Sequence, residues 1–136
     1  LIMFDLDHFK HVNDLYGHAT GDTVLAGVAA IARKAFRATD TLARHGGEEF
    51  IALLVNCGEA DAAAFAERVR AAIEGAVFAN YQGDPFKITA SFGVTAVPAD
   101  KIKDLDLNAF TRLADQALYR AKSEGRNCVF RGSMLD

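Results

Sequence analysis

Apolar residues are spaced along this chain in two patterns that predict a mixture of strands and helices. The first six residues form a short apolar run, which is too brief for three helical turns and is typical of a buried strand. Elsewhere apolar residues recur every three or four positions, which is the spacing of an amphipathic helix. This spacing predicts four helices, over residues 8–15, 22–36, 59–79 and 107–123.

Turn residues between the remaining strand-like segments predict two β-hairpins. Gly46-Gly47 accepts the positive φ of a tight turn, and a second turn is expected around Gly83. The resulting order, β-α-α-β-β-α-β-β-α-β, predicts an α+β fold: a ferredoxin-like βαββαβ core with an added helix and hairpin, its mainly antiparallel central sheet flanked by helices. The strands are predicted at residues 1–6, 41–45, 49–55, 78–81, 86–97 and 128–131.

Size and composition describe one globular domain. The 136 residues are 51% hydrophobic and 24% charged, which supplies enough apolar mass for a single core and excludes a disordered chain. The net charge of -3 argues against a nucleic-acid partner, and no apolar run approaches the roughly 20 residues of a membrane span. Cys57 and Cys128 form neither a metal-type pair nor a disulfide framework, so we expect a reducing cytoplasm and no direct membrane contact.

Three carboxylates predict a metal site. Asp5 and Asp7 lie at the end of the first strand, and Glu48 lies at the tip of the central hairpin, whose strands neighbour the first strand in a βαββ core. A cluster of carboxylate oxygens is the environment that Mg2+ or Mn2+ prefers, and such ions bridge carboxylates to phosphates. The alternative makes Asp7 a helix cap and Glu48 a solvated hairpin charge.

Phosphate-binding groups are predicted at two places. The backbone N–H groups of His8, Phe9 and Lys10 open a helix, where free donors and the helix dipole attract phosphate. Lys122 and Arg126, around the end of the last helix, add two cations. Basic residues in a last helical turn also simply compensate the helix dipole, and that alternative stays open.

Four motifs in sequence order resemble the GGDEF domain of bacterial diguanylate cyclases, in its GGEEF variant. The likeness runs from the first residue to Phe130 and also implies a core like that of nucleotidyl cyclases and polymerase palms. The motifs are Asp5-Leu6-Asp7-His8-Phe9-Lys10 with Asn13-Asp14, Tyr16-Gly17-His18 with Gly21-Asp22, Arg44-His45-Gly46-Gly47-Glu48-Glu49-Phe50, and Tyr119-Arg120-Ala121-Lys122 with Gly125-Arg126-Asn127.

The resemblance implies an enzyme that condenses two GTP molecules into cyclic di-GMP and releases two pyrophosphates. Two Mg2+ or Mn2+ ions per active site would lower the pKa of the attacking 3'-hydroxyl and neutralise the leaving group. By similarity, Asp5, the backbone carbonyl of Leu6 and Glu48 hold the metals. Glu49 is the candidate proton acceptor and Lys10 stabilises the transferring phosphate, while Lys122 and Arg126 grip the β- and γ-phosphates.

The same resemblance assigns a guanine pocket and the turn beside it. Asn13, His18 and Asp22 match the guanine-binding residues, and a carboxylate such as Asp22 can accept from both N1–H and the 2-amino group of guanine. Phe9 would belong to the substrate site, and side chains at Gly46 and Gly47 would crowd the nucleotide. Without the family, Asn13 is a polar helix-surface residue, Asp22 an N-cap and Gly46-Gly47 a plain turn.

A product-inhibition site is also implied. Arg37 and Asp40 match the RxxD motif in type and in spacing to Gly46, since arginine can stack on guanine and the carboxylate can accept from its Watson-Crick edge. Arg68 resembles a secondary arginine that binds the same product. The alternative is a surface ion pair at a helix end.

Catalysis in this family needs two domains that face each other, each holding one GTP. The chain opens inside a strand-like run, so we expect a module of a larger signalling protein whose N-terminal sensor or dimerisation domain is missing here, and which could be membrane-tethered. A homodimer is therefore the expected catalytic form. The alternative function is a non-catalytic module that binds GTP or cyclic di-GMP and signals to a partner.

Overall fold

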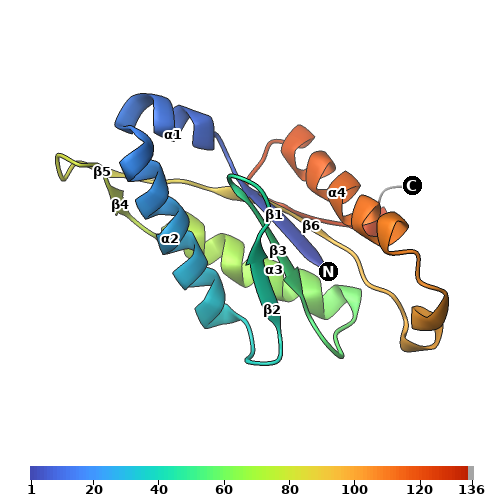
Figure 1. Ribbon diagram of the computed structural model, residues 1–136. Helices are drawn as coiled ribbons and strands as arrows, with labels where there is room; N and C mark the ends of the chain where they lie inside the picture. The colour runs from blue at the N-terminus through green and yellow to red at the C-terminus, as the bar shows by residue number, and fades with distance from the viewer. Residues whose placement is uncertain (135–136) are drawn as a thin grey trace.

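A five-stranded sheet organises the chain, and the computed structural model describes residues 1–134. The strands run in the order β2-β3-β1-β6-β7, with β6 and β7 parallel and the other neighbours antiparallel (Figure 1). A separate two-stranded ribbon pairs β4 with β5. The strands are β1 (Ile2–Leu6), β2 (Thr41–Arg44), β3 (Glu49–Leu53), β4 (Phe78–Ala79), β5 (Pro85–Phe86), β6 (Ala90–Val94) and β7 (Val129–Arg131).

Helices cover both faces of this sheet. The larger apolar cluster joins one sheet face to α2 and α3, whereas a smaller cluster joins Met3 on the other face to Ala114 and Leu118 of α4. In Figure 1, α2 and α4 lie on either side of the sheet. The helices are α1 (Phe9–Tyr16), α2 (His18–Ala35), α3 (Glu59–Gly75) and α4 (Leu107–Ser123), with 3-10 helices η1 (Ala99–Asp104) and η2 (Gly132–Met134).

The central strand β1 is buried along its whole length because both of its faces are covered. Phe4 stacks between Phe50 of β3 and Phe92 of β6, with ring centroids 5.0 and 4.7 Å away. Side chains alternate along a strand, so Ile2, Phe4 and Leu6 enter the larger cluster while Met3 and Asp5 point toward α4. This alternation is what directs Asp5 to its side of the site.

The predicted α+β fold with a ferredoxin-like order is confirmed, while several element boundaries differ from the predicted ones. α2 begins at His18 rather than at 22, because only Gly17, with φ of +89°, interrupts the helical path. The third helix ends at Gly75 instead of Ala79. The second predicted hairpin splits: its turn around Gly83 joins β4 and β5, while β6 leaves it to pair with β1. None of the helices within residues 1–134 combines the length and apolar character needed to cross a bilayer.

Candidate functional site

Asp5 stands at the centre of the candidate site. It lies opposite Glu49 on β3 and Ser91 on β6, and only 7% of its surface is exposed. Its Oδ2 accepts a hydrogen bond from Nζ of Lys122 at 2.8 Å, which also forms an ion pair. Its Oδ1 is buried and has no hydrogen-bond partner among the described residues. An orphaned carboxylate oxygen inside a protein is costly, so a water molecule, an ion or another ligand at this position would stabilise it.

Glu48 and Glu49 place two further carboxylates beside Asp5. The Leu6 N–H donates to the carbonyl of Glu48 at 3.3 Å, which brings the hairpin loop against the end of β1. Burial and the Asp5 charge raise the pKa of Glu48, and the same two causes raise the pKa of Glu49. The positive charge of Lys122 lowers the pKa of both glutamates, but by less than burial and Asp5 raise it. The cluster is therefore short of positive charge, which favours binding of a cation.

The fit of this cluster to a metal ion rests on two carboxylates and one backbone oxygen. Asp5 contributes an unpartnered oxygen, Glu48 lies next to it, and the Leu6 carbonyl belongs to the same stretch of chain. Within residues 1–134, no group of three or more His, Cys, Asp or Glu side chains is arranged to hold a metal ion. The donors are all oxygens, which suits Mg2+ or Mn2+, and the remaining ligands would have to come from substrate or water.

Asp7 is neither a member of the carboxylate cluster nor a helix cap, and both sequence interpretations of it are wrong. Its carboxylate is 4% exposed and accepts from Thr89, Ser91 and the backbone of Asn127. The N-cap of α1 is His8, in a left-handed conformation without a side-chain cap. Strand β6 runs beside β1, so the hydroxyl groups of Ser91 on β6 and of Thr89 just before it reach Asp7 before any helix amide does.

The predicted phosphate-binding groups lie at the start of α1 and around the end of α4. Lys10 is exposed on the first turn of α1, whereas the Phe9 side chain is 5% exposed and packs in the core. Only the backbone of Phe9 is thus left to face a phosphate. Arg126 is exposed in a left-handed turn just after α4, with φ of +66°, and Lys122 lies in the last turn of that helix.

The contact between α1 and α2 brings the predicted guanine residues together. A Cβ at Gly21 would collide with the Asn13 side chain and lie 3.1 Å from the ring of Phe9, so a larger residue there would displace Asn13. Asn13 therefore lies against the residue that precedes Asp22, and its Oδ1 is buried without a partner in the described part of the chain. His18 is exposed at the first position of α2. Asp22 is not the N-cap of α2, because Gly17 holds that position.

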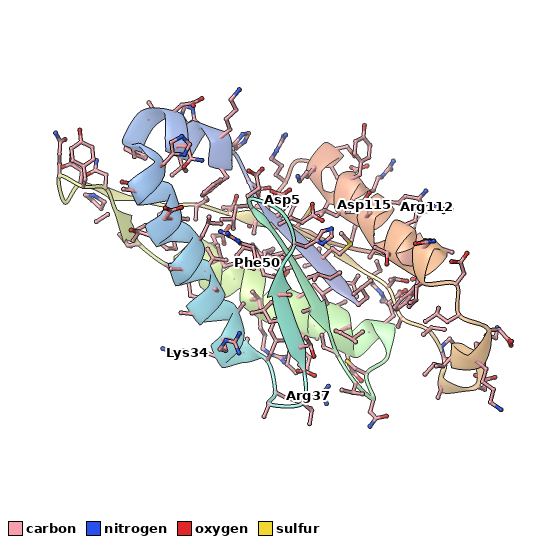
Figure 2. All side chains as sticks on the ribbon, in the orientation of Figure 1. Asp5, Lys34, Arg37, Phe50, Arg112 and Asp115 are labelled. Carbon is pink, nitrogen blue, oxygen red and sulfur yellow. The ribbon has the colours of Figure 1, made fainter. Side chains whose placement is uncertain are left out.

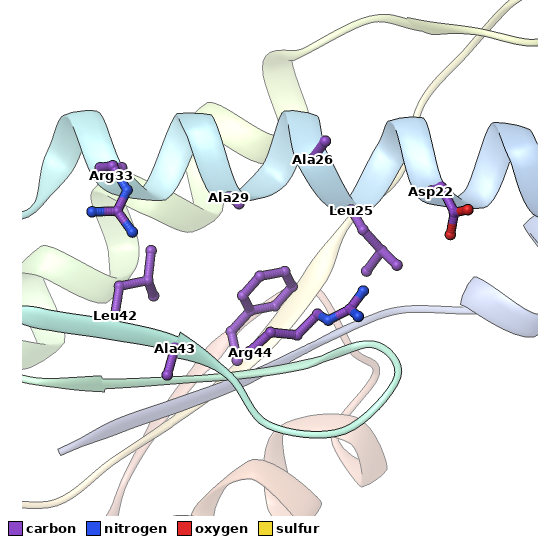
Figure 3. A pocket seen from close by; sticks show the side chains of 9 residues that line it. Asp22, Leu25, Ala26, Ala29, Arg33, Leu42, Ala43 and Arg44 are labelled. Atoms are coloured by element: carbon purple, nitrogen blue, oxygen red, sulfur yellow. The ribbon is translucent and has the colours of Figure 1, made fainter.

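A pocket of about 460 Å³ continues from Asp22 along α2. Its other wall is β2, and Figure 3 shows Arg44 reaching from that strand toward Leu25 and the Asp22 end. Arg33 closes the opposite end of the pocket. Neither Arg33 nor Arg44 has a role predicted from the sequence. The position of Arg44 directly before the hairpin loop could have drawn attention to it. The direction of its side chain, however, depends on the pairing of β2 with β3.

The double glycine at the hairpin tip leaves the approach to the cluster open. Gly46 has φ of +92°, a conformation that favours glycine. Gly47 carries no such requirement, and a Cβ at either position would meet no protein atom within 4 Å. Protein packing therefore does not explain Gly47. That side chains there would crowd a nucleotide stays a prediction.

The predicted product-inhibition residues gather at the other end of the β2–β3 hairpin. Arg37 forms an ion pair with Asp40 at 3.0 Å and donates to the Val55 carbonyl at 2.7 Å. The guanidinium groups of Arg68 and Arg37 lie 4.2 and 5.7 Å from the ring centroid of Phe65. Figure 2 shows Arg37 far from Asp5, which lies near the hairpin tip. The three residues thus form one surface cluster, separate from the carboxylates.

Comparison with known proteins links this geometry to a family. Residues 1–128 match the family described as "Diguanylate cyclase, GGDEF domain". The chain is 43% identical over 129 residues to diguanylate cyclase A of Treponema denticola, covering 95% of this chain and 34% of that protein. It is also 43% identical over 127 residues to diguanylate cyclase DgcP of Pseudomonas aeruginosa, covering 93% of this chain and 18% of that protein. The chain therefore spans about a third or less of these relatives.

Solved structures agree with the sequence comparison. The GGDEF domain of DgcB from Caulobacter crescentus, in complex with c-di-GMP, superposes with a TM-score of 0.89 at 29% identity and covers 97% of this chain and 76% of that one. The active GGEEF domain of a Vibrio cholerae diguanylate cyclase gives 0.84 at 35% identity, covering 96% and 80%. With the carboxylate cluster, the open hairpin tip and the sheet order all in place, this chain belongs to the GGDEF family of diguanylate cyclase domains.

Proposed function

We propose that this domain is one half of a diguanylate cyclase, which binds one GTP and joins it to a second GTP held by a facing copy. The observation that carries the proposal is the charge-deficient cluster of Asp5, Glu48 and Glu49, with its orphaned Asp5 oxygen, beside an unobstructed double-glycine turn. Such a site favours a polyphosphate that arrives with divalent cations. The sequence Gly46-Gly47-Glu48-Glu49-Phe50 is the GGEEF form of the family motif.

Asp5, the Leu6 carbonyl and Glu48 would hold the two Mg2+ or Mn2+ ions. When bound, these ions supply Lewis acidity toward the 3'-hydroxyl and the phosphates. Lys10, on the first turn of α1, and Arg126, just after α4, are both exposed and would bind the triphosphate. Lys122, now paired with Asp5, would contribute its charge to the same phosphates. These roles follow from the charge and the exposure of each group.

The bond forms between the 3'-oxygen of one nucleotide and the α-phosphorus of the other, and pyrophosphate leaves. Glu49 would accept the hydroxyl proton, because its raised pKa makes the carboxylate a better base than an ordinary glutamate. Two such transfers close the ring of cyclic di-GMP. One domain offers one cluster, so the complete reaction needs two domains in a homodimer.

The base and product sites would confer selectivity and feedback. Asp22 and Asn13, which lie at the α1–α2 contact, suit the N1–H and 2-amino donors of guanine, and His18 is exposed at the start of the same helix. GTP is therefore the substrate we propose, in preference to ATP. Arg37, Asp40 and Arg68 would bind the cyclic di-GMP product and inhibit the enzyme from the far end of the hairpin.

A second function is favoured by one observation. Lys122 already neutralises one oxygen of Asp5, and the described residues include no ready set of three metal-binding side chains. A domain in which this ion pair persists would bind GTP or cyclic di-GMP without turnover and report to a partner. The two functions differ in a single measurable product.

The test is incubation with GTP and Mg2+, followed by chromatographic separation of nucleotides. The chain is used at high concentration and again fused to a constitutive dimeriser. We expect cyclic di-GMP only with Mg2+, formed faster in the fusion. Glu48→Gln in the fusion should abolish turnover while the fold is retained, and substantial product from a folded variant would refute the metal role of Glu48. Nucleotide binding without product in either form would favour the non-catalytic module.

A further inference from the structure

The turn between α4 and β7 has an unusual backbone. Gly125, Arg126 and Asn127 follow one another with φ of +117°, +66° and +48°. Two of the three carry side chains, and left-handed backbone is strained for such residues unless the surroundings stabilise it. The turn also carries Arg126, an exposed cation that directly precedes Asn127. What holds this turn in place therefore decides where Arg126 stands.

Asp7 holds it from the sheet side. Its Oδ2 accepts from the Asn127 backbone N–H at 3.0 Å and from the Thr89 hydroxyl at 2.7 Å, and its Oδ1 accepts from the Ser91 hydroxyl at 2.7 Å. The Asn127 N–H is also 3.2 Å from Ser91 Oγ, which accepts from it. Asp7 is 4% and Ser91 is 0% exposed, so little water competes for these bonds. Hydrogen bonds to a buried carboxylate are among the stronger ones in proteins.

The Asn127 side chain is held from the helix side. Its Oδ1 accepts from Arg70 at 2.7 Å, and its Nδ2 donates to Glu74, both on α3. Asn127 is thus fixed at its backbone by Asp7 and at its side chain by α3. Its neighbour Arg126 makes no ion pair within residues 1–134 and stays available to a ligand.

Asp7 is also tied to the strand that carries Asp5. Asp7 lies two residues beyond Asp5 and three before Lys10 in the sequence. Its own N–H donates to the Thr89 carbonyl at 2.8 Å. One buried residue therefore connects the end of β1 to the turn that presents Arg126, across 120 residues of sequence. Three donors already satisfy the carboxylate oxygens of Asp7, so its role is to hold the segments that carry those donors in place.

We propose that Asp7 is a positioning residue for the triphosphate: through Ser91 and the Asn127 amide it fixes the turn from which Arg126 contacts the terminal phosphates. This inference rests on the proposed function, because it requires that Arg126 binds those phosphates. It predicts that Asp7 acts only through Arg126. Loss of Asp7 should therefore weaken binding of a triphosphate and leave binding of a monophosphate unchanged.

Asp7→Asn is the first variant, because an amide keeps the shape but offers one accepting oxygen to donors that now use two. Ser91→Ala is the second and removes the hydroxyl that bridges Asp7 and Asn127. Thr95→Val is the matched control. Thr95 is 1% exposed, lies four residues beyond Ser91 on the same side of the same chain stretch, and its hydroxyl has no partner in the described structure.

Calorimetry with Mg2+ would compare two probes, the α,β-methylene analogue of GTP and GMP. We expect Asp7→Asn, Ser91→Ala and Arg126→Ala each to weaken binding of the analogue by about tenfold, as for loss of a charge-assisted hydrogen bond. Binding of GMP should be unchanged, and Thr95→Val should match the wild type for both probes. The double variant Asp7→Asn/Arg126→Ala should bind the analogue no more weakly than Arg126→Ala alone.

The outcomes separate this inference from the proposed function. If Arg126→Ala leaves binding of the analogue unchanged, the phosphate role of Arg126 is wrong, and the inference fails with it. If Arg126→Ala weakens binding but folded Asp7→Asn and Ser91→Ala do not, the proposed function stands and the positioning role is overturned. Losses that multiply in the double variant, or an equal loss of GMP binding, would also overturn it. Near-UV circular dichroism establishes which variants are folded. If Asp7→Asn does not fold, the binding measurements on Ser91→Ala decide whether the positioning role holds.

Discussion

Gly93 allows α4 to lie directly on the sheet, and replacing it by alanine tests that packing. Gly93 is on β6, opposite Met3 of β1, and faces α4. A Cβ at this position would overlap the carbonyl oxygen of Ala114 and the backbone nitrogen of Leu118, and would lie 2.9 Å from the Leu118 Cα. All three are backbone atoms of α4, so no side chain can rotate away to make room.

The cost follows from these distances. Carbon atoms pack at about 3.5–4.0 Å, so α4 must move outward by about 1 Å. Inserting a methyl group into a packed core usually costs about 1–3 kcal/mol, and backbone neighbours on a helix place Gly93→Ala at the upper end, about 3 kcal/mol. With an unfolding entropy of about 2.1 cal/mol/K per residue, this corresponds to a fall in Tm of about 10 °C for a domain of this size.

Urea and thermal unfolding of the wild type and Gly93→Ala would measure this loss. Gly75→Ala is the matched control, since a Cβ there meets nothing within 4 Å and Gly75 is the last residue of α3, where alanine fits the helical backbone. We expect the control to unfold close to the wild type. A Gly93→Ala variant that unfolds within about 1 kcal/mol of the wild type would refute the close approach of α4, and with it the structural basis for the contact between Lys122 and Asp5.

The remaining predictions concern charge and feedback. Burial and Asp5 raise the pKa of Glu49, so the folded state binds its proton more tightly than the unfolded state, and this group reduces stability as the pH rises above about 4. The hydrogen bond from Arg70 lowers the pKa of Glu67, so that group contributes stability at neutral pH that is lost on acidification. Denaturation of the ligand-free domain at pH 7 should therefore show Glu49→Gln more stable and Glu67→Gln less stable than the wild type; the same sign for both would contradict the electrostatic reasoning. Arg37→Ala should abolish inhibition by added cyclic di-GMP without lowering the initial rate, and unchanged inhibition would count against the RxxD site. Phe65→Leu should weaken the same inhibition several-fold, because the ring contacts both guanidinium groups of the site.

Local pattern determined most of the fold of this protein. The apolar run of β1 and the helical spacing of α3 and α4 predicted those elements within a few residues, because burial of one face leaves a periodic trace in the sequence. The family motifs named the candidate residues, of which Asp5 and Glu48 prove to be neighbours. Their catalytic roles stay predictions.

Tertiary contacts decided what each polar residue does. Asp7 reads as a helix cap or a metal ligand because both roles depend on nearby sequence, yet its partners lie 82, 84 and 120 residues away. The pairing of Lys122 with Asp5 spans 117 residues and requires α4 to approach the sheet over Gly93. Such contacts depend on how strands align and how closely a helix packs. They leave no periodic pattern in the sequence, because hydrogen-bond partners are the groups that lie close together in the folded chain.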